Sequence, residues 1–449
     1  MSDATPRDPY SALRHDGYRR YLVGNLLSNV GRQGLSVAVA WQIYKWTNSA
    51  TALGLVGLVS VLPLIAFVLP AGTLADRFDR RRILIRTSAV SAVLSLALAL
   101  LSVFHTALPY AAPLRFANDF LRGIALHFER HTDPASLHFD NPALPLIFLI
   151  LFFQAFVRVL GNPARAALVP LLVEPTAVSN AVTWSSSSFE LSTVIGPAVG
   201  GLLVASTGYT SVYVLDAVFS LSLAMLMLGV RLHRQPTPTT GPAPDALAGM
   251  RFIWRHQSIL AAITLDLFAV LLGGAVALLP IYADQILHVG PAGLGWLRAA
   301  PAFGAITMAF LITHLRPARH PGVVMLWTVA GFGAAIVVFS LSTNLWLSLV
   351  ALYLSGVCDN FSVVVRHTLV QMKTPDKLRG RVSAVNQLFI GSSNEISEFR
   401  AGLAAALFGP VVAATAGGIG TIAVVVIVAL ALPALRTVPP LHTLEPEKD

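Results

Sequence analysis

Charged residues are scarce in this chain: they make up 12% of its 449 residues, whereas 55% are hydrophobic. Soluble domains carry about a quarter of charged residues, so this composition excludes an ordinary soluble protein. The net charge of +9 does not indicate a nucleic-acid partner, because the basic residues punctuate apolar runs instead of gathering on one polar surface. We therefore expect a lipid bilayer to be the main surroundings of the chain.

The chain also has a single cysteine, Cys358, inside an apolar segment. One thiol excludes a disulfide framework within the chain. His127 and His131 have the i, i+4 spacing of metal ligands but no third ligand nearby, so we expect no metal and no cofactor. No phosphate-binding loop or nucleophile elbow occurs, so we expect neither an enzyme nor an ATP-driven pump. Residues 1–20 lack the short apolar core of a signal peptide, so the first apolar segment should stay in the protein.

What the chain has in quantity is long apolar runs. A bilayer core of about 30 Å requires about twenty apolar residues per helix. Twelve segments meet this length, which predicts an all-α polytopic membrane protein with 12 transmembrane helices. Charges in the tenth and eleventh segments should make these two score weakly in a hydropathy window. The predicted helix centres are Leu35, Ala66, Leu94, Leu151, Val194, Ser220, Val270, Thr307, Ala334, Leu352, Phe389 and Val425.

The distribution of basic residues predicts the orientation. Most of the 31 Lys and Arg residues fall on one side of the predicted spans. Because cytoplasmic loops carry the excess of Lys and Arg, we expect both termini to be cytoplasmic in a bacterial inner membrane. The basic residues assigned to the other side are Lys45, Arg115, Arg122 and Arg130.

An internal repeat predicts two pseudo-symmetric six-helix halves. Three pairs recur at one spacing: Gly57 with Gly295, Pro63 with Pro301, and Arg81 with Arg319. Further on, Arg165 and Arg366 recur at a shorter spacing, which indicates an insertion in the first half. We expect the first half at 1–231, with the insertion at about 105–142, a cytoplasmic linker at 232–257, and the second half at 258–449. Within the insertion, apolar residues from Leu114 to Phe128 alternate three and four apart, which predicts an amphipathic helix on the outer leaflet.

The loop after the second predicted helix is similar to the signature loop of the major facilitator superfamily. It has a glycine, then an Asp-Arg pair and further basic residues, with Asp79 where that family more often has glycine. A basic stop-transfer loop would need the arginines, but not an aspartate at this spacing. The resemblance implies that the loop is a conformational switch, formed by Gly72, Asp76, Arg77, Arg80 and Arg81.

Closer likeness comes from four segments, namely 162–170, 265–274, 288–295 and 374–382. They resemble the bacterial efflux branch that includes the enterobactin exporters, from about Tyr18 to Leu435. This resemblance implies a secondary active transporter, expected to be a monomer, that exports a small amphipathic molecule, siderophore-like or drug-like, by proton-coupled alternating access. A nutrient importer of the same fold remains open, and so does a membrane sensor or scaffold that transports nothing.

The fifth predicted helix carries a further clue to direction. Its glycine-proline pattern is similar to that of drug:proton antiporters, which favours export. A small-residue face that packs against a neighbouring helix explains the same residues. The pattern consists of Gly196, Pro197, Gly200 and Gly201.

Charges inside the predicted spans mark a proton or substrate path, because a charge at the bilayer centre is costly. Glu190 and Glu395 are the favoured proton carriers, since their helices hold equivalent places in the two halves. Asp359 and Arg366, two turns apart, could instead act as a gate. Ion pairs that only fix helix packing are the alternative. Asp216 and Arg298 are expected to reach the membrane surface from near helix ends. The candidate path comprises Arg32, Arg158, Glu190, Asp266, Asp359, Arg366 and Glu395.

Overall fold

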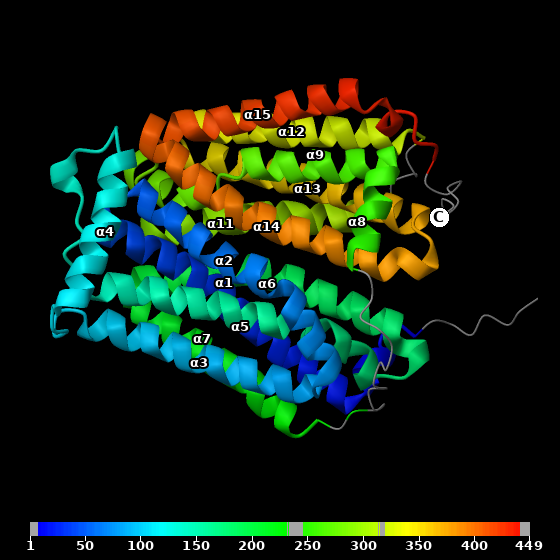
Figure 1. Ribbon diagram of the computed structural model, residues 1–449, viewed down its shortest axis with the longest axis horizontal. Helices are drawn as coiled ribbons and strands as arrows, with labels where there is room; N and C mark the ends of the chain where they lie inside the picture. Colours follow the sequence, from blue (N-terminus) through cyan, green and yellow to red (C-terminus); the bar gives the residue numbers. More distant parts are fainter. Residues whose placement is uncertain (1–7, 231, 233–245, 313, 315–318, 441–449) are drawn as a thin grey trace, which may run out of the picture. The chain divides into compact units, whose positions relative to one another are not determined.

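The computed structural model describes residues 8–230, 232, 246–312, 314 and 319–440, and over these residues it contains helices and no strand (Figure 1). Each of the twelve predicted centres lies in a separate helix, so the predicted positions are confirmed. The twelve helices are α1 (Asp16–Thr47), α2 (Ala50–Arg77), α3 (Arg80–Phe104), α5 (Ala143–Leu172), α6 (Val178–Thr207), α7 (Tyr209–Leu228), α9 (Gln257–Gly273), α11 (Gly290–Leu311), α12 (Pro321–Leu341), α13 (Leu345–Lys373), α14 (Asp376–Phe408) and α15 (Pro410–Ala431).

Ten of the helical segments among the described residues are long and apolar enough to cross a membrane. Helices α1 and α14 are long enough but carry too many polar residues to be among them. The weak score expected of the eleventh segment, α14, is therefore confirmed. The tenth, α13, does pass as a candidate span, because its charges lie in its second half and leave an apolar stretch before them.

By its internal contacts the chain separates into two compact units. Unit 1 comprises Met1–Val39, Leu62–Leu108 and Pro145–Thr240. Unit 2 comprises Ala40–Val61, Pro109–Leu144 and Gly241–Asp449. Helices α1 and α2 are thus each divided, with the end of α1 and the start of α2 belonging to unit 2.

In unit 1, helices α1 and α6 cross where both have glycine. A Cβ atom added to Gly200 would lie 2.6 Å from the Cα of Gly34 and 2.8 Å from its carbonyl oxygen. Helix α7 packs against α3 and α6. A buried core that includes Tyr18, Tyr21 and Leu168 joins α1 and α5 at one end of the unit. These contacts fix the positions of the polar side chains on α1, α3, α5 and α7.

In unit 2, helix α12 packs against both α13 and α15, and α15 packs against α9 (Figure 1). The start of α2 crosses α14 at two glycines, since a Cβ on Gly402 would lie 2.5 Å from the Cα of Gly54. Helix α9 ends at Gly273, after which the chain runs through the short helix α10 (Leu279–Ile281). The short helix α8 (Ala246–Arg255), within the predicted linker, packs on α14 at Gly249.

The insertion forms helix α4 (Ala112–Phe128), so the predicted amphipathic helix is confirmed as a helix. Within unit 2, the buried Glu129 holds the insertion against neighbouring helices. Its Oε1 accepts hydrogen bonds from the Ser49 hydroxyl at 2.8 Å and from the backbone N–H of Thr51 at 2.9 Å. The next backbone N–H, of Arg130, donates to the Ala406 carbonyl on α14 at 2.9 Å. The insertion therefore joins the first turn of α2 to the end of α14.

Candidate proton and substrate path

The most deeply buried ion pair among the described residues joins Asp266 on α9 to Arg366 on α13. Asp266 is 7% exposed and Arg366 is 2% exposed. Both lie beside the same apolar core, which includes Leu265 and Leu369. A charge in these surroundings is costly unless it is paired. The pair can stay ionised only while its two helices hold the side chains together, so it is sensitive to any relative movement of α9 and α13.

One hydrogen-bond donor of the Arg366 side chain is left without a partner in the described part of the chain. Its Nε is buried and has no hydrogen-bond partner among the described residues. A guanidinium has five N–H donors in a fixed fork, so an unused donor leaves room for a second acceptor. The site can therefore exchange partners without creating a new buried polar group. Asp359, expected two turns away on the same helix face, is half-buried.

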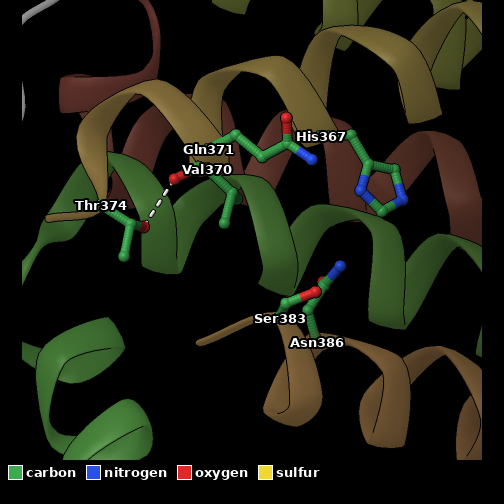
Figure 2. A pocket seen from close by; sticks show the side chains of 6 residues that line it. All are labelled: His367, Val370, Gln371, Thr374, Ser383 and Asn386. Carbon is green, nitrogen blue, oxygen red and sulfur yellow. Dashed lines mark hydrogen bonds between the residues drawn. The ribbon is translucent and has the colours of Figure 1, made fainter. Parts of the chain in front are cut away.

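Beside Arg366 along α13 lies a small polar pocket between α13 and α14. Figure 2 shows His367, Gln371 and Thr374 on α13, opposite Ser383 and Asn386 on α14. The Thr374 hydroxyl already has a hydrogen-bond partner, since it donates to the Val370 carbonyl at 2.5 Å. Asn386 is 2% exposed, and its Oδ1 has no partner in the described part of the chain. The pocket offers polar groups next to the ion pair, at the end of α13 where the chain enters α14.

A second charged cluster in unit 2 surrounds Arg298 on α11, which interacts electrostatically with Glu395 and Glu398 on α14. This cluster lies at the α2 crossing, because a Cβ on Gly57 would be 2.6 Å from the Glu395 carbonyl oxygen. The two acids and the arginine are half-buried. Arg298 was expected to reach the membrane surface, but it lies eight residues inside α11 and faces these acids.

Arg400, also on α14, has a structural role. Its Nε and Nη2 donate to the carbonyls of Leu271 and Leu272, at 2.7 and 2.6 Å, where α9 ends. The Ser397 hydroxyl donates to the Val270 carbonyl at 2.9 Å. The last turn of a helix leaves carbonyls without partners. These two side chains supply the donors that the end of α9 needs inside the unit.

The other predicted path residues lie in unit 1. Arg32 on α1 donates to the Asn29 side chain at 2.7 Å. Arg158 on α5 and Glu190 on α6 are half-buried. The carboxylate of Glu190 has no ion-pair partner among the residues that the structure describes. Among the predicted path residues, Asp266 and Arg366 contact each other directly.

Asp216 on α7 does not reach the membrane surface, and this expectation was wrong. It is 3% exposed, and its Oδ2 lies 2.5 Å from the Ser95 hydroxyl oxygen on α3, within hydrogen-bond distance. Gln154 on α5 donates to the same hydroxyl oxygen at 2.9 Å. A position eight residues into a helix fixes the depth of a side chain, but not the helix face on which it lies. The polar Ser95 and Gln154, each in an apolar run, were the signal that could have identified the site.

The predicted switch loop is held by its arginines. Arg81 donates from Nε to the Met227 carbonyl at 2.8 Å and from Nη2 to the Leu228 carbonyl, at the end of α7. Arg80 reaches the carbonyls of Ala75 at 3.3 Å and Ala167 at 3.4 Å. The loop therefore connects the ends of α2, α5 and α7.

The unusual Asp79 in this loop is explained by helix capping. Its side chain accepts from the backbone N–H of Arg81 at 2.9 Å, and its φ of −60° requires no glycine. Arg77 is exposed, and a Cβ on Gly72 would have nothing within 4 Å. The side chain of Asp76 lies outside the described part of the structure.

The glycine-proline pattern lies on α6, with Pro197 inside the helix. Gly196, Pro197, Gly200 and Gly201 are all buried. A Cβ on Gly196 would lie 2.7 Å from the Val30 carbonyl oxygen on α1, and Gly200 meets Gly34. The pattern thus forms the surface through which α6 and α1 make contact. Direction of transport does not follow from this geometry.

Comparison with known proteins extends this description. A sequence model of the Major Facilitator Superfamily matches residues 21–398. The chain is 26% identical over 423 residues to the "Enterobactin exporter EntS" of Shigella boydii serotype 18 and of Escherichia coli O139:H28, and each match covers 94% of this chain and 93% of the relative.

Solved structures share the fold at low identity. A bacterial homologue of the human lysosomal transporter Spinster, in an inward-facing and unoccupied conformation, has a TM-score of 0.65 and 15% identity over 96% of this chain and 97% of its own. A D-xylose-proton symporter has a TM-score of 0.66 and 13% identity over 94% of this chain and 98% of its own. These structures support the arrangement of helices and carry nothing about substrate.

Proposed function

Since the chain belongs to the major facilitator superfamily, we propose that it exports a small amphipathic molecule in exchange for protons. Its fold is the twelve-helix arrangement of that superfamily, in two six-helix halves. It is a multi-pass membrane protein and a transporter of small molecules, not an enzyme. Direction, coupling ion and substrate class are the proposed parts.

The buried pair of Asp266 and Arg366 supports proton coupling. A proton that binds Asp266 removes the charge that holds Arg366, so the attraction between α9 and α13 weakens. Loss of the proton restores the attraction. In an exchanger, the proton enters from outside when the site faces out and leaves to the cytoplasm when it faces in, and the substrate moves the opposite way. The polar pocket beside Arg366 supplies polar side chains on the route that we propose for that exchange.

The substrate class rests on the relatives. The proteins named enterobactin exporters match almost the full length of the chain, although at 26% identity. A siderophore-like or drug-like amphipathic molecule therefore fits better than a sugar, for which only the fold is similar. We also propose that the chain lies in a bacterial inner membrane as a monomer, with both termini cytoplasmic, the division at 232–257 separating its halves, and the loop from Gly72 to Arg81 as its switch.

Purified protein in liposomes with a trapped pH-sensitive dye tests this function. With enterobactin or ethidium as the probe, we expect substrate-dependent proton movement opposite to the substrate. The Asp266→Asn variant, which mimics the protonated acid, should lose uphill transport but keep exchange of substrate across the membrane. Glu190→Gln and Glu395→Gln serve as matched variants of the other candidate carriers.

Each outcome decides between the functions. Proton and probe moving in the same direction would support an importer. No proton movement with any probe, in protein shown to be folded, would support the sensor or scaffold. Full gradient-driven export by Asp266→Asn would move the carrier to Glu190 or Glu395, according to which glutamine variant loses coupling.

A further inference from the structure

Asp216 is a buried acid in unit 1 that the proposed coupling through Asp266 does not use. Its nearest polar neighbours come from two other helices, Ser95 on α3 and Gln154 on α5. On the α1 side Gly31 packs against it, since a Cβ there would lie 2.8 Å from Asp216 Oδ1. That oxygen is buried and has no hydrogen-bond partner among the described residues. The acid is therefore held at one oxygen only.

An ionised Asp216 would compete with a backbone carbonyl for the single hydroxyl hydrogen of Ser95. Ser95 Oγ lies 3.0 Å from the Ser91 carbonyl oxygen and 2.5 Å from Asp216 Oδ2, and both of these atoms are acceptors when Asp216 is ionised. A hydroxyl carries one hydrogen, so it can donate to only one of them. Gln154 Nε2 already donates to Ser95 Oγ at 2.9 Å. If Asp216 carries a proton on Oδ2, it donates to Ser95, and Ser95 donates to Ser91.

The surrounding charges allow this proton to leave. Arg32 on α1 is the charged group that interacts with Asp216, and it also donates to Asn29 at 2.7 Å. On α7 itself the nearest titratable residue is the buried Tyr213, one turn before. Ser95 and Gln154, which face Asp216 from α3 and α5, do not titrate. A movement of α1 that brings Arg32 closer would favour the ionised acid, and one that withdraws it would favour the protonated acid.

We propose that Asp216 is a second proton-binding site, protonated in the arrangement described here, which releases its proton when a movement of α1 brings Arg32 closer to it. This inference depends on the proposed coupling to protons and adds a site in unit 1 to the pair in unit 2. The proton passes from Oδ2 of Asp216 to water, and the acid then becomes a carboxylate facing Arg32. Ser95 and Gln154 position the acid, and Gly31, which has no Cβ, allows α1 to pack closely against it.

Infrared difference spectroscopy of the purified protein tests this site without transport. At neutral pH we expect a carbonyl band of a protonated carboxylic acid that is lost in Asp216→Asn and kept in Asp266→Asn. The band should decrease as the pH rises or when ethidium is added. The asparagine variant should remain folded, because its Nδ2 can donate to Ser95 as the protonated acid does. Ser95→Ala removes the acceptor and should shift the frequency of the band.

The results of this experiment test Asp216 independently of the proposed function. A band that persists unchanged in Asp216→Asn shows that Asp216 is ionised and overturns the inference. A band that belongs to Asp216 but responds neither to pH nor to ethidium makes it a fixed structural acid, which also overturns the inference. If Asp216→Asn fails to fold, an unchanged frequency in Ser95→Ala overturns it. Failure of Asp266→Asn to alter transport bears only on the proposed carrier in unit 2.

Discussion

Buried charged side chains in this chain are satisfied in three different ways. Asp266 meets an opposite charge on Arg366, Asp216 meets a hydroxyl, and Arg400 meets backbone carbonyls at the end of α9. Each solution offsets the cost of a charge in the bilayer, but a carboxylate can lose its charge by binding a proton, whereas an arginine stays charged. Arg400 is therefore a structural residue, whereas the two acids are candidates for coupling.

The sequence predicts that these residues are special, but not how they combine. Asp266 and Arg366 were both expected on the path from their rarity in apolar runs, and their contact depends on how α9 packs against α13. Asp216 was expected at the surface because its distance from the helix end was clear and its face was not. Pairing across helices is a property of packing, which local composition does not encode.

The glycines of α6 provide a prediction at the residue scale. Gly200→Ala should destabilise the protein, because the added methyl group would overlap Gly34 on α1, and overpacking of this kind costs ~1–3 kcal/mol. Gly72→Ala is the matched control, since its Cβ would meet open space and both substitutions raise helix propensity equally. The thermal unfolding midpoint in detergent measures both. A Gly200→Ala variant as stable as the control would contradict the packing role. It would instead favour a role of the glycine-proline pattern in the direction of transport.

At the scale of the elements, contacts at helix ends explain features of the structure that the apolar pattern does not predict. Asp79 caps α3, so the signature loop works without its usual glycine. The insertion was expected from the repeat, and its helix from the apolar spacing. The contacts that hold the insertion in place were not predicted, because the residues that Glu129 joins, Ser49 and Thr51, are distant in the sequence. The predicted helix centres were correct, and for ten of the helices apolar length alone accounts for this.

Glu129 provides the prediction at this scale. Glu129→Ala should loosen the start of α2, because an acceptor at a helix N-terminus contributes about 0.5–2 kcal/mol. We expect amide hydrogen exchange in residues 49–53 to become roughly tenfold faster, which corresponds to about 1.4 kcal/mol. Glu129→Gln keeps an acceptor oxygen and should have a smaller effect. Asp119→Ala, at an exposed position of α4, is the control. Equal exchange in Glu129→Ala and Asp119→Ala would show that the insertion is not held through this carboxylate.

At the scale of the whole molecule, unit 2 contains contacts between helices that belong to the two proposed halves. Helices α2 and α14 cross at Gly54 and Gly402, and Lys45 at the end of α1 pairs with Asp284 at 3.1 Å. Both contacts lie on the side that the basic residues assign to the exterior. Alternating access requires a closed outer end that can open. We propose that the glycine crossing and the partly exposed ion pair act as such a closure, since neither creates a large buried penalty when it separates.

The ion pair gives the corresponding prediction. Asp284→Asn should open the outer end more often, and because a partly exposed pair contributes at most about 1 kcal/mol, the increase should be up to roughly fivefold. The reporter is a cysteine at Leu403, beside Gly54, in a Cys358→Ser background. Its reaction rate with a membrane-impermeant maleimide in intact cells measures opening and also shows that this end is external. The exchanged variant, Lys45→Asp with Asp284→Lys, should restore the slow rate, while Asp8→Asn, which removes an ion pair to Arg14 in unit 1, should change nothing. If the exchanged variant reacts as fast as Asp284→Asn, the two side chains do not hold the outer end closed through their charges, and the glycine crossing is left as the closing contact.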